Sequence, residues 1–295
     1  MAPVAGAARG LLVETAAAKV NLSLRVLGRR ADGYHELESL VVFAGVGDVV
    51  TLDVAEPLGL EVTGPEAAGL AEGPNLVLKA VEAARSADAT LSFGRFRLEK
   101  HLPVAAGLGG GSADAAAALR LVARVNPERA RHLAWMAIAA AIGSDVPVCL
   151  GGRAAMMSGR GEHVAPLVVI PDAWLVLANP RVGLSTSRVF RALGAPALTA
   201  APLASTAPAL ASLDDLTDYL SARPNDLEPV AIGLCPLVGH VRAALSQLDG
   251  TLLARMSGSG ATCFALFADA ALAKAGAATL AVRHPDWWVQ AAPIL

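Results

Sequence analysis

The sequence predicts an α+β protein of two domains, and two features of the chain carry this prediction. Short runs of β-branched residues alternate with alanine-rich runs of helical periodicity, as in a mixed fold. Strand-like runs also occur on both sides of the central region, where "AWLVLANP" begins a new unit. A chain of 295 residues can bury a core in each of two modest domains. We therefore expect domains at residues 1–165 and 166–295.

Five runs have the pattern of strands. In the first domain, residues 19–26 ("KVNLSLRV"), 48–55 and 95–102 alternate apolar and polar side chains, as strands with one buried face do. In the second domain we expect strands within residues 173–180 and 261–269.

Helices are expected where alanine and leucine recur with helical spacing. These runs are residues 75–87, 112–125, 128–143 and 237–248. Gly143 is a candidate C-cap for the third of them. The Ala/Pro/Ser-rich segment Ala195–Leu213 is of low complexity, so we expect a mobile surface connection there.

Composition excludes several classes of protein. Three widely spaced cysteines, Cys149, Cys235 and Cys263, predict neither a disulfide framework nor a zinc site, so we expect a reducing cytoplasm. Although 54% of the residues are hydrophobic, alanine supplies much of that fraction, and no stretch of about 18 strongly apolar residues could span a membrane. The N-terminus reads as mature chain because it lacks a basic and then apolar leader. A net charge of −2 without a basic block argues against nucleic acid as a partner.

A glycine-rich loop precedes the second predicted helix, in "HLPVAAGLGGGSADAAAALRLVARV". A Walker A loop would need a Lys-Ser/Thr pair after its last glycine, but Gly111 is followed by Ser112 and Ala113. The dinucleotide fingerprint also fails, because its third glycine would fall on Ser112. Neither of these two nucleotide-binding motifs therefore describes the loop.

The loop keeps one chemical capability. Glycines let backbone N–H groups approach a ligand closely, and Ser112 can cap a helix whose first N–H groups are unpaired. Together these groups favour an anion, most often a phosphate. The alternative is an ordinary glycine-rich turn with Ser112 as its N-cap.

Two charged residues stand in unusual surroundings. Asp145 is the only charge between Arg131 and Arg153. It is either the cap of a helical turn or a carboxylate in a partly dry cleft that could accept a proton from a hydroxyl group. Lys19 begins a predicted strand, where a lysine is usually a solvated edge residue. If Lys19 instead points into the same cleft, it could hold Asp145 ionised and steady an attacking oxygen.

Five motifs in order resemble the GHMP small-molecule kinase superfamily. They are "AAAKVNLSLRVLGRRADGYHELESL", "LPVAAGLGGGSADAAAAL", "IGSDVPVCLGGRAAMMSGRGE", "RPNDLEPVA" and "MSGSGATCFALF". The resemblance covers about residues 14 to 270. It implies a ribosomal-protein-like N-terminal domain and a ferredoxin-like C-terminal domain with the active site in the cleft between them.

The resemblance implies roles for individual residues. Lys19 and Asp145 match the catalytic lysine and aspartate of the superfamily. The phosphate loop for ATP matches Pro103, Gly107, Leu108, Gly109, Gly110, Gly111 and Ser112. Asn75 matches an asparagine near the adenine, and Lys100 matches a basic residue facing the nucleotide, although a solvated edge position is the alternative for Lys100. The "MSGSGA" turn is expected to face the cleft from the C-terminal domain.

The stretch "ADGYHEL" resembles the diphosphocytidyl kinases within this superfamily. There Tyr34 would stack on a pyrimidine, His35 would hydrogen-bond the base edge, and Phe190 would pack on the other face of the base. Asn21 lies on the same strand face as Lys19 and is expected to touch the substrate, as is Thr186. Without the resemblance, the two aromatic residues would be ordinary half-buried side chains and His35 a surface histidine.

The expected reaction is therefore transfer of the γ-phosphoryl group of ATP to the 2-hydroxyl of 4-diphosphocytidyl-2-C-methyl-D-erythritol in non-mevalonate isoprenoid synthesis. Mg²⁺ is expected with ATP, and Asp114 is left unassigned as its ligand because a favourable helix dipole explains that residue equally well. The partner is a small molecule carrying a cytidine diphosphate group, without nucleic acid or membrane, and the protein is a monomer or homodimer. A homoserine or mevalonate-type kinase would leave "ADGYHEL" and Phe190 without a role. A non-catalytic ligand-binding protein would not need Lys19 and Asp145, and both residues are present.

Overall fold

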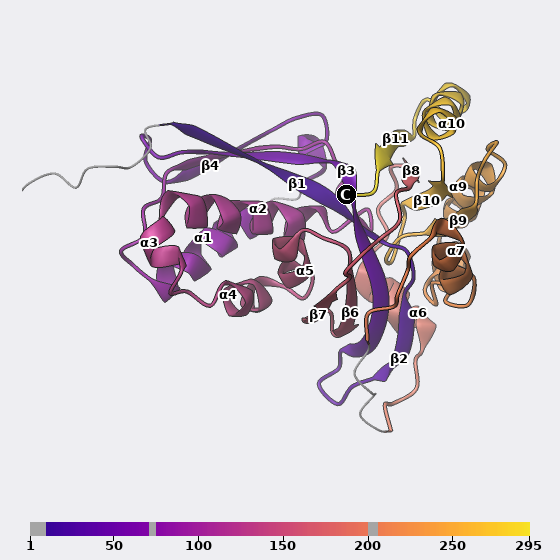
Figure 1. The fold of residues 1–295 in the computed structure, drawn as a ribbon, viewed down its shortest axis with the longest axis horizontal. Helices are drawn as coiled ribbons and strands as arrows, with labels where there is room; N and C mark the ends of the chain where they lie inside the picture. Colours follow the sequence, from indigo (N-terminus) through magenta and orange to yellow (C-terminus); the bar gives the residue numbers. More distant parts are fainter. Residues whose placement is uncertain (1–9, 71–74, 200–205) are drawn as a thin grey trace, which may run out of the picture.

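The computed structural model describes residues 10–70, 75–199 and 206–295, which form two β-sheets with helices packed against them (Figure 1). The first sheet is organised by the long strand β3, His35–Asp53. One end of β3 pairs with β1 (Leu11–Asn21) and β5 (Arg95–Glu99), and the other end pairs with β2 (Arg25–Arg29) and β6 (Ala155–Gly159). This one strand therefore connects the two ends of the sheet.

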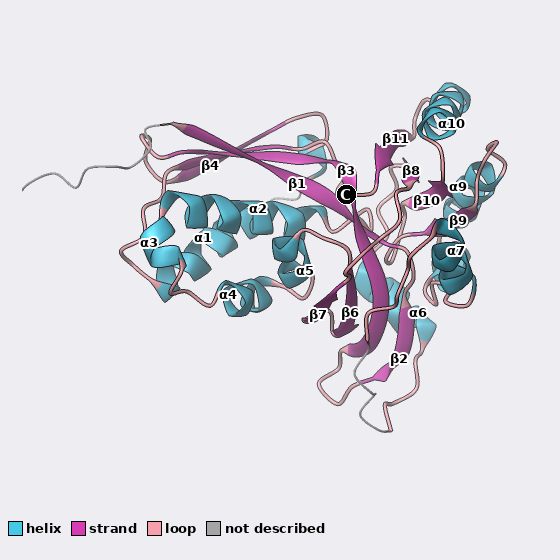
Figure 2. Cartoon of the chain, viewed as in Figure 1, coloured by secondary structure: helices cyan, strands magenta, loops and turns pink. Residues whose placement is uncertain are grey.

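Two short strands complete the first sheet, and its α-helices lie together on one side of it (Figure 2). β4 (Gly59–Thr63) is parallel to β5, and β7 (His163–Pro166) is antiparallel to β6. The helical segments are η1 (Ala67–Gly69), α1 (Leu76–Ala87), α2 (Gly110–Val125), α3 (Pro127–Ala130), α4 (Trp135–Ile142) and α5 (Val146–Gly151).

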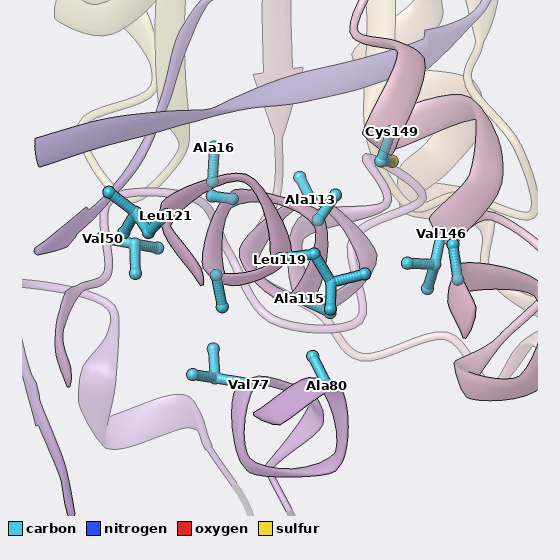
Figure 3. Close-up of a cluster of buried hydrophobic side chains, with 14 of the residues drawn as sticks. Ala16, Val50, Val77, Ala80, Ala113, Ala115, Leu119, Leu121, Val146 and Cys149 are labelled. Atoms are coloured by element: carbon cyan, nitrogen blue, oxygen red, sulfur yellow. The ribbon is translucent and has the colours of Figure 1, made fainter. Parts of the chain in front are cut away.

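Helix α2 is the centre of the first core because its alanines let neighbouring elements approach closely. Ala113 and residues 115–118 are buried and pack in one cluster with side chains of β1, β3 and α1. Figure 3 shows Ala113 and Leu119 between Ala16 of β1 and Val77 of α1. The core thereby fixes the start of α2, which the glycine loop precedes.

The second sheet has the strand order β11-β8-β10-β9, all antiparallel. Its strands are β8 (Trp174–Asn179), β9 (Leu253–Met256), β10 (Cys263–Phe267) and β11 (Trp288–Pro293). Its helices are α6 (Thr186–Leu193), α7 (Leu213–Ser221), α8 (Glu228–Leu234), α9 (Pro236–Ser246) and α10 (Ala270–Arg283). A β-α-β-β-α-β order of elements with α10 between β10 and β11 is ferredoxin-like, so this expectation is confirmed.

The two sheets are joined through a shared apolar cluster and through backbone contacts. Side chains of β1 and β3 pack in one cluster with side chains of β8 and β10. The chain's C-terminus lies beside β3 (Figure 1), where the Leu295 N–H donates to the Phe43 carbonyl at 2.9 Å. Leu24, beyond β1, donates to the carbonyl of Pro224 at 3.3 Å. Contacts on both sides thus hold the cleft between the sheets.

Two predicted elements are divided in the structure. The strand expected at residues 19–26 is split between β1 and β2, because the residues between them leave the ladder and the Leu24 N–H donates to Pro224 instead. The helix expected at 128–143 is divided into α3 and α4. At the break, the indole N–H of Trp135 donates to the Ala130 carbonyl at 2.8 Å. Gly143 is the C-cap of α4, as predicted.

The segment Ala195–Leu213 was expected to be a mobile surface connection, but both of its described ends are held by contacts. Residues 200–205 lie outside the described residues. Leu198 donates its N–H to the Arg29 carbonyl at 2.8 Å, so this end pairs with β2. Leu210 is buried in the core that the two sheets share. Across the described ranges, no helix has the length and apolar character that crossing a membrane requires.

Candidate active site

A cavity of about 1150 Å³ lies between the two halves of the fold. Every residue that the sequence analysis proposed for the site lines it, except Leu108. The lining combines the end of β1, the β2–β3 turn and the glycine loop with α6 and the β9–β10 turn of the second half. Tertiary contact therefore brings residues from both ends of the chain to one site.

The glycine loop runs directly into α2. The helix begins at Gly110, and its N-cap is Gly109 in a left-handed conformation with φ of +61°. The prediction that Ser112 caps the helix is wrong, because Ser112 already lies in the first helical turn. The unpaired N–H groups of that turn border the cavity and favour an anion there.

Lys19 and Asp145 form an ion pair in the cavity. The Lys19 Nζ lies 2.8 Å from Asp145 Oδ2, with 5% of the lysine side chain and 33% of the aspartate side chain exposed. The backbone N–H of Lys19 donates to the Leu108 carbonyl at 2.9 Å, which ties the lysine to the loop. A Cβ at Gly109 would lie 3.0 Å from Lys19 Cε, so the loop needs glycine where this side chain passes. The solvated-edge reading of Lys19 is therefore wrong.

Asp145 stands at the N-cap position of α5 but makes no capping hydrogen bond with its side chain. Its carboxylate instead accepts the hydrogen bond from Lys19. The alternative in which Asp145 merely caps a turn is thus excluded for its side chain. A partly exposed carboxylate and a buried ammonium are thus held together in the lining of the cavity.

Asn21 and the "MSGSGA" turn meet beside this pair. The Asn21 side chain donates to Ser39 Oγ at 2.7 Å, and its backbone N–H donates to Ser257 Oγ at 3.1 Å. Ser257 Oγ in turn donates to the Gly107 carbonyl at 2.9 Å, which joins the turn to the glycine loop. The Asn21 Oδ1 atom is buried and has no hydrogen-bond partner among the residues that the structure describes. An acceptor without a donor therefore belongs to a residue that lines the same cavity as the ion pair.

Three further residues expected near the nucleotide, Asn75, Leu108 and Lys100, each have a different environment in the structure. Asn75 is the N-cap of α1, and its Oδ1 accepts from the Val77 N–H at 2.8 Å. Leu108 does not line the cavity, because its side chain is buried in the core shared by the two sheets. Lys100 lines the cavity but is 3% exposed and bonded to Asp48 and Asp114, so the solvated alternative for it is wrong.

The "ADGYHEL" turn and α6 form the other end of the cavity. The rings of His35 and Phe190 lie 4.8 Å apart at a tilt of 30°, while Arg160 lies over the Tyr34 ring at 5.0 Å. Phe190 thus contacts His35 in this structure. Burial, together with the charge of Arg29, lowers the pKa of His35, so the neutral imidazole that can both donate and accept dominates at neutral pH.

Several lining residues were not singled out from the sequence. They include Arg29, Arg160, Arg191, Met157 and Ser187. Arg160 is flanked by Gly159 and Gly161, both with positive φ, and this Gly-Arg-Gly turn within "MSGRGE" was the available signal. A Cβ at Gly161 would lie 3.1 Å from the Ser144 carbonyl, so the turn sits against the residue that precedes Asp145.

Comparison with known proteins agrees with this geometry. The GHMP kinases N terminal domain family matches residues 75–153, and the GHMP kinases C terminal family matches residues 206–282. A homoserine kinase from Cytophaga hutchinsonii covers 100% of this chain and 97% of its own, with a TM-score of 0.65 at 16% identity, which shows a shared fold. The chain belongs to the GHMP kinase family, and it is a small-molecule kinase with the family's two-domain fold.

Within this family the chain is similar to one particular kinase. A 4-diphosphocytidyl-2-C-methyl-D-erythritol kinase of Parvibaculum lavamentivorans is 51% identical over 282 residues, covering 95% of this chain and 97% of that protein. A crystal structure of 4-(cytidine 5'-diphospho)-2C-methyl-D-erythritol kinase has a TM-score of 0.77 and 31% identity, covering 96% of this chain and 99% of that one.

Proposed function

We propose that this protein transfers the γ-phosphoryl group of ATP to the 2-hydroxyl of 4-diphosphocytidyl-2-C-methyl-D-erythritol, a step of non-mevalonate isoprenoid synthesis. The observation that carries the chemistry is the Lys19–Asp145 pair in a cavity bordered by a glycine loop. The observation that carries the choice of acceptor is the full-length similarity to kinases of this name. The small molecule is the partner, and the three free cysteines fit a reducing cytoplasm.

Asp145 is the general base of this proposal. Its carboxylate accepts the proton of the substrate hydroxyl as the oxygen attacks the γ-phosphorus. Lys19 donates to this carboxylate and to the attacking oxygen, since an ammonium 2.8 Å from the carboxylate reaches the same hydroxyl. Both residues are held by backbone, β1 for the lysine and the start of α5 for the aspartate.

ATP fits the glycine loop on geometric grounds. A Cβ at Gly107 would lie 2.5 Å from the Ser257 carbonyl, so the loop and the "MSGSGA" turn approach more closely than side chains allow. The first N–H groups of α2 then bind phosphate oxygens, with the helix dipole in their favour.

Mg²⁺ would accompany the triphosphate and offset its charge. No group of three potential metal ligands converges among the residues that the structure describes. The residues present fit an ion that the phosphates of ATP mainly hold, and Asp145, with 33% of its side chain exposed, is a carboxylate that lines the same cavity.

The acceptor fits the other end of the cavity. The unpaired Asn21 Oδ1 is an acceptor for a hydroxyl of the erythritol chain, and burying it without a donor would cost about 1–3 kcal/mol. The neutral ring of His35 can bond the edge of a cytosine, and the Tyr34 and Phe190 rings offer faces for stacking. Thr186, bonded to Ser259 Oγ at 2.8 Å, places α6 against the "MSGSGA" turn.

The test is phosphoryl transfer from ATP to a panel of alcohols. The panel holds 4-diphosphocytidyl-2-C-methyl-D-erythritol, homoserine and mevalonate, with a control without acceptor, and ³¹P NMR identifies the position of the new phosphate. The expected result is a 2-phosphate on the cytidyl substrate alone. Transfer to homoserine or mevalonate would assign the protein to another branch of the family, and ATP binding without transfer to any alcohol would indicate a binding protein.

A further inference from the structure

Beneath the glycine loop lies a buried cluster of three ionisable side chains, which we call the loop clamp: Asp48, Lys100 and Asp114. Asp48 is on β3, Lys100 follows β5, and Asp114 is on α2. The residues are 0%, 3% and 3% exposed, respectively. The Lys100 Nζ donates to Asp114 Oδ2 at 2.8 Å and also to Asp48 Oδ2. Burying a charge is costly unless it is paired, and this ammonium is paired twice.

The clamp holds the entrance of the loop through Asp48. Its Oδ1 accepts the backbone N–H groups of His101 and Leu102 at 2.6 and 2.8 Å. These two residues come directly after Lys100, which follows β5, and they lead towards the glycines. Because both bonds run to the backbone, they fix the path of the chain irrespective of the side chains that it carries.

The clamp holds the exit of the loop through Asp114. This residue belongs to α2, five positions after the N-cap Gly109, so its position moves with the helix start. Lys100 passes directly under that start, since a Cβ at Gly110 would lie 3.5 Å from Lys100 Nζ and 3.7 Å from Asp48 Oδ2. The ammonium therefore connects the residues before the glycines with the residues after them.

A structural role in the core explains the clamp poorly. The opposite face of α2 is already buried among apolar side chains, and buried ion pairs are a weak source of stability because desolvation offsets their attraction. Hydrogen bonds are directional, so two carboxylates bonded to one ammonium fix the relative positions of the elements that carry these three residues. Here those elements are the two ends of the segment that binds phosphate.

We infer that Lys100, Asp48 and Asp114 are positioning residues, which hold both ends of the glycine loop so that its N–H groups meet the phosphates of ATP. This inference rests on the proposed binding of ATP by the loop and is independent of the alcohol that accepts the phosphate. Lys100 and Asp114 also line the cavity, so the clamp borders the space that the nucleotide would occupy.

The test compares ATP and adenosine binding by calorimetry in the absence of any acceptor. Asp114→Ala leaves Lys100 paired with Asp48, so the cluster keeps a balanced charge while its link to α2 is lost. ATP should bind about tenfold more weakly, the loss expected for one hydrogen bond to a charged group, whereas adenosine, which has no phosphates, should bind as before. Asp114→Asn, whose amide oxygen can still accept from Lys100, should restore ATP affinity to within about threefold of the wild-type value.

Leu121→Ala is the control for stability. Leu121 is buried on the same helix and makes no bond to the clamp, so this variant should lower the melting temperature and leave ATP affinity unchanged. The inference would be overturned if Asp114→Ala bound ATP as tightly as the wild type, or if it lost ATP and adenosine binding equally. It would also be overturned if Leu121→Ala lost as much ATP affinity as Asp114→Ala. Normal ATP binding combined with no transfer to the cytidyl substrate would refute the proposed acceptor and leave the clamp standing.

Discussion

Replacing Gly109 by alanine tests whether the glycine loop sets the position of Lys19. Gly109 has φ of +61°, and its added Cβ would lie 3.0 Å from Lys19 Cε and 3.2 Å from Lys19 Cβ. The left-handed conformation costs an alanine about 1–2 kcal/mol. The contact with the lysine near its backbone cannot be relieved by moving a flexible tip, so Lys19 must shift by a few tenths of an ångström.

The expected effect on catalysis follows from that shift. Because misplacing a reacting group by about 1 Å can cost on the order of 10²-fold in rate, a smaller displacement should lower kcat by about tenfold. Steady-state kinetics with saturating ATP and acceptor, together with urea unfolding, would separate this effect from the loss of stability.

Gly152 provides a matched control. It has φ of +62°, and the atoms nearest to an added Cβ would lie 3.8 and 3.9 Å from it, which is ordinary van der Waals contact. It does not line the active-site cavity. Gly152→Ala should therefore lose a similar free energy of unfolding and keep its kcat. Equal kcat values for the two variants would refute the view that Gly109 is needed for the position of Lys19.

Three further predictions address the other parts of the site. Asp145→Asn should lower kcat by about 10²–10⁴-fold with both substrates still bound, and adding Lys19→Met should cost less than the product of the single effects, as measured by a kinetic double-mutant cycle. Phe190→Ala should weaken cytidyl-substrate binding by about 1–3 kcal/mol, seen as a higher KM with unchanged ATP affinity. Burial raises the pKa of Asp114 from 3.8 to about 7, so the folded protein holds a proton that the unfolded chain has lost between these pH values. The free energy of unfolding should therefore fall as pH rises from 5 to 7, by at most about 1.4 kcal/mol per pH unit, relative to Asp114→Asn in urea titrations.

Each of these predictions has a result that contradicts it. Full activity in Asp145→Asn would place the base elsewhere, and losses that simply multiply would mean that Lys19 and Asp145 act independently. If ATP affinity fell in Phe190→Ala while the KM for the cytidyl substrate did not change, the assignment of the two ends of the cavity would be wrong. A wild-type stability that changes with pH in parallel with that of Asp114→Asn would contradict the raised pKa of Asp114.

The sequence by itself determined the features that depend on nearby residues. Local residue type predicted the helix that ends at Val125 and the strand within residues 261–269, because an alanine-rich run favours a helix and a short apolar run favours a buried strand. The four glycines around the start of α2 predicted close approach of the backbone to a ligand, since this property belongs to the residue type. Five ordered motifs identified the family in the same way.

The tertiary structure alone decided which distant side chains meet. Lys19 and Asp145 are 126 positions apart, so no local pattern could distinguish their ion pair from a solvated strand end and a capped turn. Lys100 reads locally as an edge residue but is buried between carboxylates from β3 and α2. Ser112 is a good N-cap by residue type, yet the helix starts earlier at Gly110. In each case burial and pairing depend on elements far apart in the chain, and these are fixed only when the two sheets and α2 pack together.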